Sequence, residues 1–438
     1  VGFSPDGVPF AGPLYQAGIV PSPATRPLAA GDHVIVEVEL AFRLARDLPS
    51  REASRDGIVA AIDSALVGIE LIRGRLGEPP AVPFLAFLAD NAGNVFTDNR
   101  PASGDERQVR VQYNPIAQYV AVALLADAGD RFRTAAPALA RQSRDSALAC
   151  WRSMDARAAD AFHRWTSVRS WRLLAALRLH DRGVVAEAAV TALVTGLLDV
   201  QDGRGFFWMD ADRRDPYRGI THAAQPAIAL CSFIERDFEH PLVDRAREAL
   251  ELLWDGYVAP LTAANPYGIV PYGLYAEPRT AVAGDVYHEF APGLYYRFFM
   301  PAHAPERVNH GLASHWASWA HALGMMGRVL ERREYRDAAF DQLAWLMGAN
   351  PLGVSMVSGV GMRNATPYSR FLGPMPGGFM LGPKGTAADT AWADVDGRLA
   401  WSSGEYWLAP LANTLMALAE LLPGTVAPSR RLGLPPQA

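Results

Sequence analysis

The sequence contains almost no lysine. Of the 41 basic residues, Lys384 is the only one that is not arginine. A mechanism that needs a lysine Schiff base or a lysine general base is therefore excluded unless Lys384 supplies it. Cysteine is equally scarce, and Cys150 and Cys231 both lie in apolar helical patterns. These positions predict buried thiols and not a disulfide framework.

Long apolar runs and basic patches are also missing. No run approaches the roughly 18 residues that indicate a membrane span. The net charge is −5, and no basic stripe carries interleaved aromatics, so neither a membrane nor a nucleic acid is expected as a partner. The chain begins with Val1, and its first residues do not resemble a secretory signal. We expect a soluble, bacterial-type protein, and we leave its compartment and oligomeric state open.

The character of the sequence changes near Gly93. Upstream, short β-like runs carry carboxylates, and downstream, amphipathic helical segments follow one another almost to the end. A chain of 438 residues has room for more than one domain. The change predicts a small mixed α/β domain over residues 1–94 and a mainly helical domain over residues 95–438.

Two carboxylates share one face of a predicted strand. Residues 34–42 are rich in β-branched side chains, and Glu37 and Glu39 are two positions apart. Residues 56–67 predict a helix, and residues 68–72 predict a second strand that carries Glu70. Three convergent carboxylates would suit Mg²⁺. The alternative places Glu37 and Glu39 on the solvated face of a half-buried sheet.

Four segments in this region carry a family resemblance. They are PFAGPLYQAGIVPSPA, VEVELAFRLARDLP, VGIELIRGRL and FLADNAGN. Together they resemble the 2-keto-4-pentenoate hydratase branch of the fumarylacetoacetase-like superfamily. The resemblance implies that Glu37, Glu39 and Glu70 bind the catalytic metal. The family's catalytic lysine has no counterpart, because the chain starts at Val1, one position after it.

From about Tyr113 onward the pattern is helical. Apolar residues recur at three- and four-residue spacing, which predicts an all-α assembly of paired helices. No short-period repeat is present, which argues against a solenoid. The predicted helices span residues 115–133, 136–153, 166–181, 184–199, 222–234, 242–255, 311–331, 335–347 and 405–421.

The strongest local signal lies between Trp345 and Leu422. It comprises WLMGANPLGVSMVSGVG, PYSRF, PGGFMLGPKG and DVDGRLAWSSGEYWLAPLANTLMALAELL. These segments resemble the end of the family-9 glycoside hydrolase domain, an (α/α)₆ toroid that cuts β-glucans with inversion. The resemblance implies that Glu405, at the start of the final helix, is the general acid. It implies a sugar contact by Arg370, and we add Tyr368, Trp401 and Tyr406 as substrate-binding aromatics.

An inverting hydrolase also needs a carboxylate base. The family supplies it from an Asp-Ala-Gly-Asp motif, and this chain contains those letters at Asp127–Asp130. Because they fall at the end of a predicted helix, we interpret them as a coincidence in which Gly129 ends the helix and Asp130 is exposed. The position of the base stays open. The candidates are Asp98, Asp105, Asp285 and Glu289.

Three hypotheses follow. The first is a glycoside hydrolase that acts on a carbohydrate without a cofactor. The second is a Mg²⁺-dependent hydratase of 2-keto acids, and the third is a fused chain without efficient activity. The histidines show no metal-ligand spacing. His315 and His321 lie on one apolar helix, which predicts polar groups satisfied in the core.

Overall fold

The computed structural model describes residues 2–3, 9–10, 33–44, 62–74, 114–157, 161–236, 239–276, 284–303, 309–368 and 374–422. The chain divides into two compact units. One contains residues 15–114, and the other contains residues 1–14 and 115–438. The predicted boundary between residues 94 and 95 lies outside the described residues and stays a prediction.

The described residues of the unit 15–114 form an antiparallel pair of strands, β3 (His33–Leu44) and β4 (Ile62–Gly74). The predicted strands are confirmed, but the helix predicted over residues 56–67 is wrong for residues 62–67, which belong to β4. Its alanine and leucine favoured a helix locally, and continuous pairing with β3 overrides that preference. The register places Glu37 opposite Glu70 and Glu39 opposite Gly68.

The second unit is mainly helical. It also contains the two-residue strands β1 (Gly2–Phe3) and β2 (Pro9–Phe10), which pair with each other. Its helical elements are α3 (Pro115–Arg131), α4 (Pro137–Asp155), η1 (Ala161–Arg164), α5 (Thr166–His180), α6 (Glu187–Leu198), α7 (Gln225–Arg236), α8 (Val243–Leu253), the π-helical turn η2 (Trp254–Val258), α9 (Ala259–Ala263), α10 (Ala313–Val329), α11 (Arg333–Leu346), α12 (Trp401–Gly404) and α13 (Leu408–Leu421).

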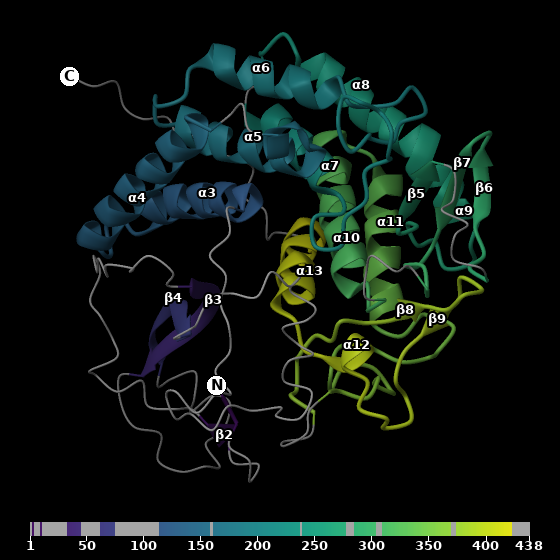
Figure 1. Cartoon of the computed structure of the whole chain (residues 1–438). Coiled ribbons are helices and arrows are strands. Elements are labelled where there is room, and N and C mark those ends of the chain that lie inside the picture. The colour runs from purple at the N-terminus through teal and green to yellow at the C-terminus, as the bar shows by residue number, and fades with distance from the viewer. Residues whose placement is uncertain are drawn as a thin grey trace. The chain divides into compact units, whose positions relative to one another are not determined.

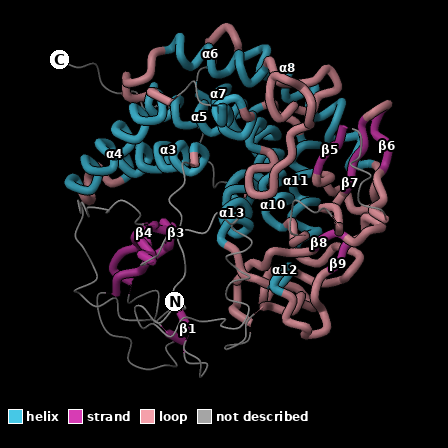
Figure 2. Tube along the Cα trace, viewed as in Figure 1, coloured by secondary structure: helices cyan, strands magenta, loops and turns pink. Residues whose placement is uncertain are grey.

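The long helices form two layers (Figures 1 and 2). Helices α3, α5, α7, α10 and α13 each contact the next, and α4, α6, α8 and α11 pack on α3, α5, α7 and α10 respectively. In the described part of the chain these contacts give four inner–outer pairs and one further inner helix. The arrangement of these helices is part of an (α/α)₆ toroid. Each helix predicted from residue 115 onward overlaps an observed one. None of the described helices has the length and apolar character to cross a membrane.

Helix α10 is the centre of this arrangement. It is buried along nearly its whole length because its sequence, ASHWASWAHALGMMGRV, carries a charge only near its end. That charge, Arg328, forms a 2.6 Å hydrogen bond to Glu420 of α13 and an ion pair with Glu235 of α7. At the other end, the Trp316 and Trp345 rings lie 4.4 Å apart in the core between α10 and α11. Arg328 thus joins three inner helices, and the tryptophan pair joins α10 to the outer helix α11.

The Asp127–Asp130 segment has a structural role. It lies within α3, where Asp127 accepts a hydrogen bond from Arg178 and Asp130 accepts one from Arg182, both arginines lying in or just after α5. Gly129 does not end the helix, which continues to Arg131. A Cβ at Gly129 would overlap the Arg144 side chain of α4, so this glycine permits the close approach of the two helices. The interpretation of the motif as a coincidence agrees with these contacts.

Short strands occur among the helices, although the sequence carried almost no strand signal. β5 (Gly273–Ala276), β7 (Leu294–Arg297) and β6 (His288–Ala291) form an antiparallel sheet in that order, and β8 (Lys384–Gly385) pairs with β9 (Ala391–Trp392). At two to four residues each, these strands are too short to show a two-residue period.

Candidate functional site

Three segments meet where α10 and α13 begin. They are residues 309–313, which lead into α10, residues 380–385, and residues 402–407, which lead into α13. Backbone hydrogen bonds join the middle segment to both others: Ala313 donates to Leu381 at 2.8 Å, and Leu381 donates to Glu405 at 2.8 Å. Gly311 also donates to Ser402 at 2.7 Å. These bonds fix the position of Glu405 relative to the start of α10.

Glu405 lies between two helices. It follows α12 and precedes α13, which starts at Leu408, so the prediction that Glu405 opens the final helix is wrong. The extended backbone at Glu405, with φ −64° and ψ 137°, is the reason. The side chain is half-buried. Its Oε2 accepts a 2.9 Å hydrogen bond from the indole N–H of Trp407.

The turn before α12 is built around Asp394. Its buried carboxylate accepts backbone hydrogen bonds from Asp396, Arg398 and Ala400 at 3.0–3.1 Å. Burial alone would raise the pKa of Asp394, and these backbone donors outweigh it, so the pKa is lowered. Asp394 also donates its backbone N–H to the Ser403 hydroxyl. The Asp394 carboxylate thereby fixes the backbone of the turn that leads to Glu405.

Two of the predicted substrate-binding aromatics, Trp401 and Tyr406, lie near Glu405 along the chain, and the third, Tyr368, meets this segment through its backbone. Trp401 is 39% exposed at the start of α12, and Tyr368 donates its backbone N–H to Gly404. The Tyr406 hydroxyl pairs with the Ser358 hydroxyl at 2.6 Å and accepts the Met375 N–H, which are contacts that hold the loop. The sugar-binding role of these three residues stays a prediction. Arg370 lies outside the described residues.

Two residues near Glu405 were missed as site residues. The rings of His310 and Trp407 lie in tilted contact, 5.6 Å apart between centroids, and His310 precedes α10 by only a few positions. The imidazole Nδ1 lies 2.8 Å from the Gly311 carbonyl oxygen. The sequence offered one signal for Trp407, its place two positions after Glu405. It offered none for His310, because the contact joins residues 97 positions apart.

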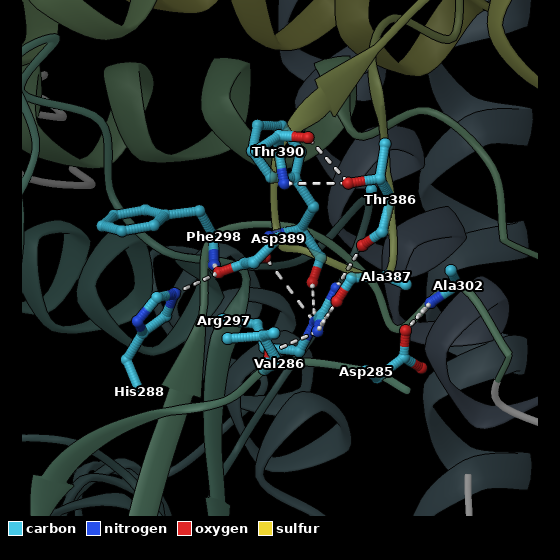
Figure 3. A network of polar contacts seen from close by, with 12 residues as sticks. Asp285, Val286, His288, Arg297, Phe298, Ala302, Thr386, Ala387, Asp389 and Thr390 are labelled. Atoms are coloured by element: carbon cyan, nitrogen blue, oxygen red, sulfur yellow. Dashed lines mark hydrogen bonds and ion pairs between the residues drawn. The ribbon is translucent and has the colours of Figure 1, made fainter. Parts of the chain in front are cut away.

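The β8–β9 hairpin leaves this site from the 380–385 segment. Its tip is held by Asp389, whose carboxylate accepts the N–H groups of Phe298 and Phe299 at 2.9 and 3.0 Å. The fully buried Arg297 and the ring of His288 also face this carboxylate, at 3.6 and 3.1 Å (Figure 3). Asp389 adopts a left-handed backbone with φ 59°. Four donors around the Asp389 carboxylate hold the hairpin tip in place.

The two described candidate bases, Asp285 and Glu289, differ in exposure. The Asp285 side chain is fully buried and accepts the N–H groups of Ala302 and His303, both at 3.2 Å, so it stabilises a turn. Glu289 is exposed on β6. Asp98 and Asp105 lie outside the described residues.

His315 and His321 are buried, as predicted. Burial lowers the pKa of each to about 4, so both rings are neutral at pH 7. His315 Nδ1 contacts the Gly219 carbonyl at 3.2 Å, and its Nε2 has no hydrogen-bond partner among the described residues. The prediction of satisfied core histidines is therefore only half met for His315.

Within the described side chains, no three His, Cys, Asp or Glu residues group in a way that could hold a metal ion. Cys150 and Cys231 are free thiols, Cys231 fully buried and Cys150 half-buried. The side chains of Glu37, Glu39 and Glu70 are not among those described, so their metal site stays a prediction.

No protein-family model matches the sequence, and no curated protein matches it. Among solved structures, the GH family 9 endoglucanase J30 aligns over 74% of this chain with 17% identity and a TM-score of 0.50. The fold resembles that of a family-9 endoglucanase. At this identity the similarity concerns the fold alone. The aligned part is 57% of the J30 chain, so this chain spans little more than half of that enzyme.

Other endoglucanases align less well. A single-mutant thermostable endoglucanase from Alicyclobacillus acidocaldarius is 18% identical over 74% of this chain and 58% of its own, with a TM-score of 0.49. The endoglucanase of the termite Nasutitermes takasagoensis is 16% identical over 70% of this chain and 65% of its own, with a TM-score of 0.44.

Proposed function

We propose that the helical unit is a glycoside hydrolase that cleaves O-glycosidic bonds of a β-glucan-type polysaccharide or oligosaccharide by inversion, with Glu405 as the general acid. The observation that carries the proposal is the placement of Glu405. It is a half-buried carboxyl group that lies where two inner helices begin, in a fold that resembles a family-9 endoglucanase. No metal or organic cofactor is needed for this reaction.

The surroundings of Glu405 suit an acid that must donate one proton in one direction. The Trp407 indole N–H donates a hydrogen bond to Oε2 of Glu405, and Oε1 of Glu405 makes no hydrogen bond within the described part of the chain. A protonated Oε1 would donate to the glycosidic oxygen as the bond to the anomeric carbon breaks. Water attacks the opposite face, and a second carboxylate takes its proton from about 6.5–9.5 Å away. Of the candidates, Glu289 is the described one whose side chain is exposed.

The release of reducing ends from a soluble β-glucan tests this proposal. Glu405→Gln keeps the shape and the Trp407 contact but removes the proton, and we expect a loss of about 10²–10⁴-fold in kcat. Glu187→Gln makes the same chemical change at an exposed position on α6 and should keep full activity. Retention of activity in Glu405→Gln would refute the assignment.

A hydratase activity of residues 1–94 is a second proposal. The observation that favours it is the register of β3 and β4, which sets Glu37 directly opposite Glu70, with Glu39 two positions along. Carboxylates suit Mg²⁺, which would act as a Lewis acid when bound. Mg²⁺-dependent loss of a 2-hydroxydienoate chromophore, abolished by Glu37→Ala, would support it. Turnover of neither substrate would leave the third proposal, a fused chain without efficient activity.

A further inference from the structure

The only lysine of the chain faces a tryptophan across the β8–β9 ribbon. Lys384 and Trp392 are directly opposite each other in the antiparallel register, so their side chains share one face. The Lys384 ammonium lies 4.8 Å from the centre of the Trp392 ring, within the range of a cation–π contact. Both side chains are half-buried.

Among the residues that the structure describes, the ammonium group has no acidic partner. Within the described residues, Lys384 forms neither an ion pair nor a hydrogen bond through Nζ, although most of the described salt bridges join arginines to carboxylates. Burial lowers the pKa of Lys384, and no nearby carboxylate offsets that effect. A partly desolvated cation without a counter-ion would gain free energy from an anionic ligand.

The hairpin that carries this pair is rigid at both ends. At its tip, the Thr386 and Thr390 hydroxyls pair at 2.7 Å, and Asp389 is held by the donors around it (Figure 3). At its base, Asn309 donates its side-chain N–H to the Gly385 carbonyl at 2.8 Å. A cation and an aromatic ring held in place lose little conformational entropy on binding a ligand.

The pair also lies close to the proposed acid. Leu381 donates its backbone N–H to the Glu405 carbonyl, and Lys384 follows Leu381 by three residues. Even a fully extended chain places the Cα atoms of residues 381 and 384 within about 11 Å of each other. An oligosaccharide whose cleaved bond lies at Glu405 would therefore be able to reach Lys384 and Trp392 with a neighbouring sugar.

We propose that Lys384 and Trp392 form a subsite for an acidic sugar, with the indole ring against the sugar face and the ammonium group paired with its carboxylate. The substrate class is then a β-linked oligosaccharide that carries uronic acid units. This inference rests on the proposed function for the identity of the ligand as a carbohydrate. The contact is an ion pair without a bidentate geometry, because lysine is a compact point charge.

A binding measurement tests the subsite separately from catalysis. Calorimetry on the full chain would compare cellotetraose with a β-1,4-linked glucuronic acid tetramer, which differs from it by carboxylates at C6. We expect the acidic tetramer to bind about 3–10-fold more tightly at low salt, and this preference to shrink at 0.5 M salt. Lys384→Gln should abolish the preference, and Lys384→Arg should retain most of it.

Arg333→Gln is the matched control, because it removes one positive charge from an exposed side chain of α11 and should leave the preference unchanged. Equal affinity for both tetramers, no binding of either, or a preference that survives Lys384→Gln would each overturn the subsite. Hydrolysis is scored separately. A preference that depends on Lys384 in a chain without glycosidase activity would support the subsite while refuting the proposed function.

Discussion

The indole N–H of Trp407 donates a 2.9 Å hydrogen bond to Oε2 of Glu405. The two residues are separated by Tyr406 alone, in an extended segment between α12 and α13. The Trp407 ring in turn contacts the ring of His310, which precedes α10, in a tilted geometry. One aromatic side chain thus links the proposed acid to the start of the neighbouring inner helix.

Trp407→Phe should impair catalysis without weakening binding. The substitution keeps an aromatic ring but removes the hydrogen bond that orients Glu405. The carboxylate of Glu405 gains its charge as the proton leaves in the transition state, and a hydrogen bond to a charged group contributes roughly 1.5 kcal/mol. We therefore expect kcat to fall about 10-fold with KM unchanged. Steady-state kinetics on a soluble β-glucan measure both parameters. Trp165→Phe, at a position 37% exposed before α5, is the control. A rise in KM at constant kcat would contradict the positioning role.

Gly404→Ala should displace Glu405. A Cβ at Gly404 would overlap the Thr366 carbonyl and crowd the Tyr368 N–H, so the backbone before Glu405 must shift. We expect activity to fall by at least about 10-fold, since small displacements of catalytic groups are costly. Gly203→Ala is the matched control, because no atom lies within 4 Å of its Cβ position. Equal activity of both variants would show that the segment tolerates the shift.

Asp389→Ala should destabilise the helical unit. It removes the carboxylate that faces the fully buried Arg297 and accepts two backbone N–H groups. Loss of one partner of a buried charged pair costs about 3–5 kcal/mol. Asp337→Ala, at a side chain 65% exposed, should change the free energy of unfolding by no more than about 0.5 kcal/mol. Denaturant unfolding measures both, and similar values for the two would contradict the network.

The buried histidines should make the protein acid-sensitive. The folded pKa of His321 is about 4, below its ordinary value of 6.5, because burial disfavours the cation. Between these values the unfolded chain binds a proton that the folded chain excludes, so stability falls as the pH decreases from 6.5 to 4. The loss is roughly 3 kcal/mol at pH 4 from this histidine alone.

His321→Gln should remove part of this pH dependence. Thermal unfolding at pH 7 and pH 4.5 would show a smaller difference in Tm for His321→Gln than for the unaltered chain. His303→Gln, at a side chain 57% exposed, should keep the full difference. An unchanged slope in His321→Gln would contradict the burial of a neutral ring.

The helices were predictable because each carries its own signal. Three- and four-residue spacing of apolar residues marked α10 and α13 without reference to the rest of the fold. The positions at which helices begin were less predictable, as the final helix shows. Glu405 and its neighbours adopt an extended backbone because Glu405 is hydrogen-bonded to the backbone of Leu381. The helix expected over residues 56–67 was wrong for residues 62–67 for a similar reason, since pairing with β3 makes these residues a strand.

The candidate site was predictable only where its chemistry is local. The resemblance singled out Glu405, and the aromatic residues near it in the sequence added Trp401 and Tyr406. The roles of Asp389 and Arg297 depend on contacts between residues about 90 positions apart, and no periodicity or motif encodes such a contact. Lys384 was visible as the sole lysine, but its tryptophan partner required the register of β8 and β9.

The dependence of hydrolysis on the leaving group tests the role of Glu405 most directly. An aryl β-cellobioside with a dinitrophenolate leaving group needs no proton, whereas the glycosidic oxygen of a β-glucan does. We predict that Glu405→Gln loses about 10²–10⁴-fold in kcat on the glucan and less than about 10-fold on the aryl glycoside. An equal loss on both substrates, or no loss on either, would contradict general acid catalysis by Glu405.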